Sequence, residues 1–274
     1  MKYIKKNEEP KKFADWKKQE NPTTWKYLRY SVKSTVRDSL IDEQGHICCY
    51  CGTKIQKDNT RIEHLKPREF YKQDIFNYSN LLASCYGSSK DIYIDIKEND
   101  TLEKIANQHS VPKEEIEFLN PNIDFNVSNL PKKIKISKIA DCRPEDLHCD
   151  PRKDNNEIPI NPLMPDCEDY FQYRSADGEM VSTGSQEAED TISILGLNAK
   201  LCKDSRKSRL DGIIKEVNNI MLNEKPTKEI FRFKIEKLIN RYKQRNDESQ
   251  FQPYCFVFIS YLQSFLKKAN NSKR

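Results

Sequence analysis

Cys48-Cys49-Tyr50-Cys51-Gly52 is the segment around which this 274-residue chain is expected to fold. Cys48 and Cys51 have the spacing that lets two thiolates bind one tetrahedral zinc ion. Gly52 allows the backbone to turn around the metal. The alternative is that both cysteines are simply buried thiols, but three cysteines in four residues are costly without a metal. Because this pair is half of a zinc site, two further ligands are expected elsewhere in the chain.

The cysteine content favours metal binding over disulfide bonds. The chain has 9 cysteines, an odd number. Its first residues, Met1 to Lys12, are charged and do not resemble a secretory signal. Disulfide frameworks belong to exported proteins, so a cytoplasmic location is expected and the cysteines are left for metal.

The composition is that of a polar, helix-rich globular protein. Apolar residues make up 36% and charged residues 32% of the chain, and no apolar run approaches the length of a membrane span. The net charge of +5 permits nucleic-acid binding without arguing for it.

The second half of the zinc site is assigned to Cys85 and Cys149. Cys142 and His148 are the rival ligands, since both lie in the later cysteine-rich stretch. All four are residue types that zinc accepts.

A second motif, Arg61-Ile62-Glu63-His64, follows the cysteine pair. A lone histidine is more often a packed or surface residue than a catalyst. Here the preceding Glu63 offers a carboxylate for a hard divalent cation, and the imidazole of His64 can deprotonate water. The pair therefore predicts a hydrolytic site.

Two further segments carry candidate polar residues. Asn80 could hold a loop through backbone hydrogen bonds, or be an ordinary loop residue. Asp150 follows Cys149 directly and could offer a second oxygen ligand, and Lys153, one turn later, could reach a phosphate. The alternative is a solvated Asp and Lys in a loop.

Hydrophobic spacing divides the chain into three parts. Helices are expected over 1–45, broken at Asn21-Pro22, and again over 186–270, with two of them at about 226–245 and 253–268. Strand and helix patterns over 91–138 indicate a compact β-α-α-β insertion. The expected domains are 1–90 plus 139–185, then the insertion 91–138, then a helical region 186–274.

The order of these motifs resembles HNH endonucleases with a treble-clef zinc site. More closely it resembles the HNH proteins of bacterial anti-phage systems, the Septu PtuB-like and retron-associated family. The resemblance spans most of the chain outside 91–138. It rests on these motifs: Lys5/Glu9-Pro10, Trp16, Trp25, Cys48-x2-Cys51-Gly52, Ile62-Glu63-His64-x2-Pro67, Asn80-Leu81-Leu82-x2-Cys85, Cys149-x3-Lys153, Pro159-x2-Pro162-x3-Asp166-Cys167, Phe171-x-Tyr173, Thr191-Ile192-x2-Leu195-x-Leu197-Asn198, Arg206 and Arg209.

The resemblance implies an α+β fold: a ββα-metal (HNH) core with flanking N- and C-terminal helices. It implies His64 as general base, Glu63 and Asp150 as ligands of a catalytic Mg²⁺ or Mn²⁺, and Asn80 as the supporting middle residue of the motif. The structural Zn²⁺ would be held by four cysteines, and basic residues would contact nucleic-acid phosphates. The four cysteines are Cys48, Cys51, Cys85 and Cys149, and the basic residues are Lys66, Arg68, Arg152 and Lys153.

The separation of Cys85 and Cys149 departs from the family, in which the two lie close together. Here residues 86–148 intervene, and most of them form the insertion. The insertion resembles a LysM module over Tyr93 to Ile136. LysM modules bind N-acetylglucosamine polymers, but glycan binding is not expected here. We expect the insertion to be a repurposed contact surface or a structural insert.

The function expected from these features is phosphodiester hydrolysis of DNA or RNA. The resemblance implies a role in anti-phage defence with an SMC/ABC-type (PtuA-like) ATPase partner. No association with a membrane is expected. Two alternatives stay open: an RNase toxin that cleaves tRNA with the same site, and a zinc-binding adaptor whose motif is inactive. The basic run from Lys200 to Arg209 fits a nucleic-acid face, a partner surface or solvated charge.

Overall fold

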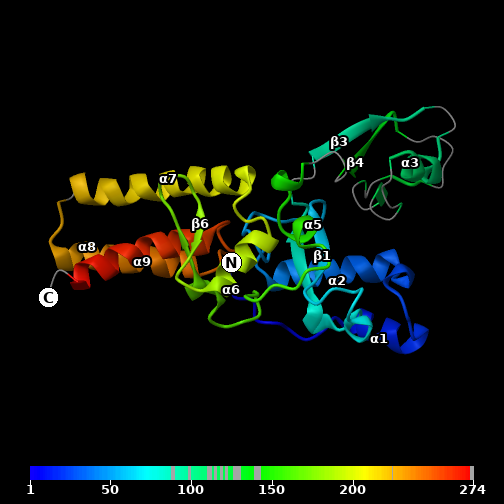
Figure 1. Cartoon of the computed structure of the whole chain (residues 1–274), viewed down its shortest axis with the longest axis horizontal. Helices are drawn as coiled ribbons and strands as arrows, with labels where there is room; N and C mark the ends of the chain where they lie inside the picture. The colour runs from blue at the N-terminus through cyan, green and yellow to red at the C-terminus, as the bar shows by residue number, and fades with distance from the viewer. Residues whose placement is uncertain are drawn as a thin grey trace.

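The protein has a mixed α+β fold, as expected, with three separate two-stranded antiparallel sheets in the part of the chain described. The computed structural model describes residues 1–87, 90–97, 100–109, 113, 116–117, 120, 123–125, 131–138, 143–223 and 225–271. Figure 1 shows long helices at one end of the molecule and the β1–β2 hairpin with the N-terminal helices towards the other.

The N-terminal part is two helices followed by a hairpin. The first helix stops at Asn21, whose left-handed backbone caps it, and Pro22 cannot continue a helix. In the hairpin Glu63 pairs with Leu82 and His64 with Leu81. Ile62 lies in β1, whereas Ile55 lies outside the named strands, next to an isolated bridge between Ile47 and Lys54. The elements are α1 (Lys11–Glu20), α2 (Tyr30–Glu43), β1 (Thr60–His64), β2 (Leu81–Cys85) and the short 3-10 helices η1 (Trp25–Tyr27), η2 (Lys72–Asp74) and η3 (Tyr78–Asn80).

The hairpin is completed by short elements from the middle of the chain. The four-residue helix α5 (Asp150–Lys153) packs beside β1, and its Lys153 contacts Glu63 and His64. The remaining elements here are η4 (Pro144–Asp146), η5 (Cys167–Tyr170), β5 (Phe171–Tyr173), β6 (Met180–Ser182) and α6 (Gln186–Ile194).

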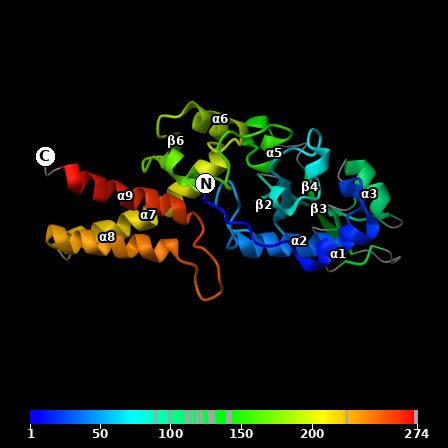
Figure 2. The same ribbon diagram turned by 90° about the horizontal axis from the view of Figure 1, so that it is seen from below.

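Three C-terminal helices pack side by side at the other end, as Figures 1 and 2 both show. They are α7 (Lys200–Asn223), α8 (Lys228–Lys243) and α9 (Cys255–Asn271), close to the bounds expected from hydrophobic spacing. They enclose a second apolar core, and Tyr173 contacts both this core and the N-terminal one. No helix among the described residues has the length and apolarity needed to cross a bilayer.

The segment between β2 and α5 has its own small core. β3 (Lys90–Asp95) pairs antiparallel with β4 (Lys133–Lys138), and α3 (Leu102–His109) lies between them in sequence. The buried residues are Ile105, Ala106, Ile116, Ile134 and Ile136. The second helix of the expected β-α-α-β insertion falls mostly outside the described residues.

Candidate active site

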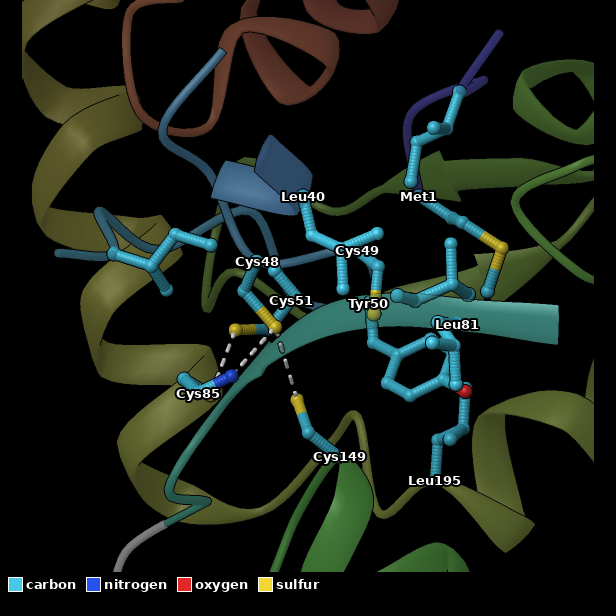
Figure 3. Close-up of a cluster of buried hydrophobic side chains, with 14 of the residues drawn as sticks. Met1, Leu40, Cys48, Cys49, Tyr50, Cys51, Leu81, Cys85, Cys149 and Leu195 are labelled. Carbon is cyan, nitrogen blue, oxygen red and sulfur yellow. Dashed lines mark hydrogen bonds between the residues drawn. The ribbon is translucent and has the colours of Figure 1, made fainter. Parts of the chain in front are cut away.

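Four cysteine sulfurs meet in the N-terminal core (Figure 3). The Sγ atoms of Cys48 and Cys149 lie 3.8 Å apart and those of Cys51 and Cys85 lie 3.7 Å apart. All four lie within 4.8 Å of one another. A zinc ion with Zn–S bonds of ~2.3 Å needs sulfurs about 3.8 Å apart, whereas a disulfide needs about 2.05 Å. The donor set and its spacing therefore fit one tetrahedral zinc ion.

The turn that carries Cys48 and Cys51 requires a glycine. Gly52 has φ +78°, and an added Cβ would lie 2.4 Å from the ring of Phe256 in α9. The turn is closed by hydrogen bonds from Cys48 N to Thr53 O and from Gly52 N to Cys48 O. The cysteine turn is thereby packed against α9.

The rival ligand His148 lies beside the cluster and is not one of its four members. Its Nδ1 is 3.2 Å from the Cys149 sulfur. The backbone N–H of Cys85 donates to the Cys48 sulfur over 3.3 Å, which favours a thiolate there. Cys142, the other rival, lies outside the described residues.

Cys149 connects the sulfur cluster to the candidate catalytic residues. It has φ +58°, which is strained for a residue other than glycine, and its N–H donates to Leu195 O over 2.8 Å. Helix α5 begins at the next residue, Asp150. A zinc ion held by Cys149 would therefore also hold the start of α5 against β1.

Glu63 is buried and engaged by two side chains. Tyr50 donates its hydroxyl to Glu63 Oε1 over 2.9 Å, and Lys153 Nζ lies 2.9 Å from the same oxygen. Burial and the nearby charge of Asp150 raise the pKa of the Glu63 carboxyl well above its usual range. Sequence reasoning missed Tyr50, whose only signal was its place between the two cysteines.

The placement of Lys153 corrects one expectation. We expected this side chain to contact substrate phosphates, but it is 1% exposed and its ammonium faces Glu63 and the carbonyl of His64. An ammonium inside the fold next to a buried carboxylate offsets the cost of burying that charge. Lys153 is therefore a buried partner of Glu63 and not a surface contact for phosphate.

His64 is held in one orientation by its surroundings. Its Nε2 is 3.0 Å from the Ile75 carbonyl, which only accepts, so Nε2 carries the proton and Nδ1 has a free lone pair. The ring of Trp25 meets it edge-on at 4.5 Å between centroids. Burial, with the charge of Arg68, lowers the pKa of His64 to about 3, so the imidazole is neutral at physiological pH.

Asn80 fixes the loop that orients His64. Its amide Nδ2 donates to Lys66 O over 3.1 Å and to Asp74 O over 3.2 Å, and its Oδ1 accepts from Lys66 N over 2.7 Å. Ile75, whose carbonyl holds His64, follows Asp74 directly. The expected supporting role of Asn80 thus has a structural counterpart.

Glu63, His64 and Asp150 line one cavity of about 770 Å³. Arg61 also lines it, with Nη1 3.6 Å from Asp150 Oδ2. Two neighbouring carboxylates repel each other in a partly buried site, and carboxylate oxygens are the donors that Mg²⁺ and Mn²⁺ prefer. The pair therefore fits a divalent cation that completes its coordination with water and substrate oxygens.

The four basic residues expected to bind phosphates lie in different places. Arg68 lines the cavity. Lys66 pairs with Asp74 at 3.1 Å, Arg152 donates to the Pro144 carbonyl over 3.0 Å, and neither is among the lining residues. Basic residues that line the cavity but were not singled out from the sequence are Lys26, Lys33, Arg37 and Arg61.

The basic run of α7 is partly structural. Arg206 is 1% exposed and donates to the carbonyls of Gly178 and Leu197. Lys200 and Lys207 pair with acidic residues one turn later in the helix. These contacts indicate that the basic run of α7 serves internal contacts and solvated charge.

Replacing Lys153 with methionine is expected to lower the free energy of unfolding by about 3–5 kcal/mol, because it leaves the Glu63 carboxylate buried without its cation. Urea unfolding without added divalent cations measures this. The matched control is Lys57→Met, which breaks an exposed pair with Asp38 and should cost under about 1 kcal/mol. Equal unfolding midpoints for the two variants would contradict the buried-pair assignment.

The sequence is similar to that of a curated protein. It is 24% identical over 192 residues to a Vibrio cholerae (serotype O1 biovar El Tor) protein named "Retron Vc95 putative HNH endonuclease", and the match covers 67% of each chain. No family model matches the sequence.

Proposed function

We propose that this chain is a metal-dependent endonuclease of the HNH type that hydrolyses phosphodiester bonds in nucleic acid. The observation that carries the proposal is the cavity lined by a neutral, oriented histidine and two carboxylates. These groups come from β1 and α5, which are far apart in sequence, and the sulfur cluster lies next to both. The similarity to a protein named as an HNH endonuclease supports the same reading.

The four-cysteine cluster is proposed to hold a structural zinc ion. Four thiolates leave no open coordination position for substrate or water. The cluster's ligands come from the loop after α2, from the end of β2 and from the residue before α5. Zinc would therefore join three segments beside the catalytic cavity, one of which leads directly into Asp150 of its lining.

His64 is proposed as the general base. Its Nδ1 would take a proton from the attacking water as the water oxygen bonds to phosphorus and the bond to the leaving oxygen breaks. The Ile75 carbonyl and Asn80 keep the ring oriented. A divalent cation on Glu63 and Asp150, when bound, would polarise the phosphate and stabilise the charge on the leaving oxygen.

The remaining residues of the cavity are proposed to support this chemistry. The guanidinium groups of Arg61 and Arg68 line the cavity and can contact phosphate oxygens. Lys153 and Tyr50 both contact Oε1 of Glu63 and hold this carboxylate in place. We propose both as positioning residues.

The proposal is tested by nuclease assays on the purified protein. Plasmid DNA, single-stranded DNA and total tRNA are incubated with Mg²⁺ or Mn²⁺, with and without EDTA, and compared with Asp150→Asn protein. Cleavage that needs the cation and is lost in Asp150→Asn is expected. Cleavage of tRNA alone would favour the RNase toxin, and no cleavage of any substrate would favour the inactive adaptor.

Acidification from pH 8 to 5 is expected to weaken metal binding rather than protonate His64. The raised pKa of Glu63 lets a proton compete with the cation, while the lowered pKa of His64, about 3, keeps its ring neutral. The Mg²⁺ concentration for half-maximal rate should therefore rise as pH falls, and saturating Mg²⁺ should restore the rate. Initial rates across Mg²⁺ concentrations at each pH measure this. An activity loss centred near pH 6.5 that saturating Mg²⁺ leaves unchanged would contradict it.

The biological setting is proposed from the family resemblance. We propose an anti-phage effector of the Septu PtuB-like or retron-associated kind, located in the cytoplasm, acting with an SMC/ABC-type ATPase. The division into 1–90 plus 139–185, 91–138 and 186–274 remains part of this proposal, with 91–138 as a LysM-like insertion. The antiparallel pairing of β3 with β4 and the separate small core support an insertion that folds by itself.

A further inference from the structure

One wall of the catalytic cavity is a single stripe of helix α2. Tyr30, Lys33, Ser34 and Arg37 all line the cavity, and their spacing places them on one helical face. The opposite face, with Val36 and Leu40 at 0% exposure, packs into the core. Arg37 is 5% exposed and contacts Ser34 and Asp38. The helix therefore presents an aromatic ring, Tyr30, and an ammonium, Lys33, to the space that contains His64.

The ring of Tyr30 is half exposed, so its exposed part contributes nothing to the packing of the fold. Its exposed fraction is 50%, although it stands at the first position of a helix whose other face is buried. The two other aromatic residues that line the cavity are already engaged. Trp25 is held against His64 and Phe76, and Tyr86 is 8% exposed with the guanidinium of Arg61 over its ring. Tyr30 is thus the ring of this wall whose face is available to a ligand.

An aromatic face beside cationic groups suits an unpaired nucleotide. Bases stack on tyrosine through their flat faces, and phosphates pair with lysine and arginine. In a duplex both faces of each base are covered by neighbouring bases, so a duplex offers phosphates to this wall and nothing to Tyr30. An exposed ring next to a positive charge therefore favours an unpaired nucleotide over a duplex.

We infer that the substrate is a single-stranded stretch of nucleic acid, with one base stacked on Tyr30 and an adjacent phosphate on Lys33. This inference rests on the proposed nuclease function, because it assigns the substrate of the same cavity. Tyr30 acts as a specificity-determining residue and takes no part in bond cleavage.

The experiment uses one mixed sequence in four forms: single-stranded DNA, single-stranded RNA and the two matching duplexes. Rates are measured with full-length wild type, Tyr30→Ala, Tyr30→Trp and Tyr27→Ala. Binding is measured by fluorescence anisotropy in the His64→Ala background. Tyr27 is the matched control, since it is 65% exposed and lies outside the cavity lining. The DNA and RNA arms identify which single strand is used.

Tyr30→Ala is expected to raise KM and Kd for single strands by about tenfold to a hundredfold, with kcat within about twofold. Tyr30→Trp should retain wild-type values, and Tyr27→Ala should match wild type. Equal use of duplex and single strand by the wild type would overturn the inference, and so would an equal loss in the Tyr27 and Tyr30 variants. Tyr30-dependent binding of single strands without cleavage would support this inference while rejecting the nuclease proposal. If the protein neither cleaved nucleic acid nor bound single strands through Tyr30, the inference and the nuclease proposal would both be rejected.

Discussion

Cys48→Ala protein is expected to lose its zinc and to fail to fold around the cavity. A structural zinc site can supply on the order of 10 kcal/mol or more of folding free energy, while a domain of this size is stable by only about 5–15 kcal/mol. Cys48, Cys51 and Cys149 lie outside the named helices and strands, so no regular element holds their sulfurs together. Metal analysis by mass spectrometry and thermal unfolding followed by circular dichroism measure the two effects.

Cys167→Ala is the matched control for this experiment. Cys167 is also 0% exposed and belongs to the same apolar core, but it is not one of the four clustered sulfurs. It should keep one equivalent of zinc and lose about 1–2 kcal/mol from the small cavity it leaves. If Cys48→Ala also kept a full equivalent of zinc and melted with the wild type, the zinc assignment would be wrong.

His64→Ala protein is expected to cleave at least a hundredfold more slowly, with unchanged zinc content. A positioned general base contributes about 10²–10⁴ to a rate, and the Ile75 hydrogen bond and Trp25 contact place this imidazole in one orientation. The loss should fall on kcat, because the arginines that line the cavity still bind substrate. Single-turnover rates with saturating Mg²⁺ measure this.

His109→Ala serves as its control. His109 ends α3, within 91–138, and does not line the cavity, so the rate should stay within about twofold of wild type. Wild-type cleavage by the His64 variant would remove the imidazole from the mechanism. Equal losses in both variants would point to damage to the fold.

Clustering of metal-ligand residue types was visible in the sequence because it is a local property. Zinc needs thiolates at short, regular spacing, and the Cys48–Cys51 pair shows it directly. The two remaining cysteines were chosen from several candidates, and they are the ones whose sulfurs lie with the first pair. Helix bounds near the C-terminus were also readable, since a helix repeats its apolar contacts every three or four residues.

The environment of each polar side chain was not readable in this way. Lys153 looked like a phosphate contact because its sequence neighbours are polar, yet its ammonium is buried on Glu63. Tyr50 gave no signal beyond its place between two cysteines, and Ile75 gave none, although the Tyr50 hydroxyl and the Ile75 carbonyl decide how Glu63 and His64 are held. Such contacts join segments separated by many residues, so no local pattern encodes them.

The amino-acid order by itself determined which residues can bind metal, roughly where the C-terminal helices run, and which histidine has an acidic neighbour, because these follow from side-chain chemistry and from spacing along one segment. It did not determine the N-terminal bounds, since helix was expected over 1–45 but residues 1–10 are not helical and α2 begins at Tyr30. Only the tertiary structure decided which face of α2 meets the cavity, which amine lies beneath the carboxylates and which tautomer His64 adopts. Burial and hydrogen-bond partners depend on packing between distant segments, and those two quantities set the charge and orientation of every group in the site.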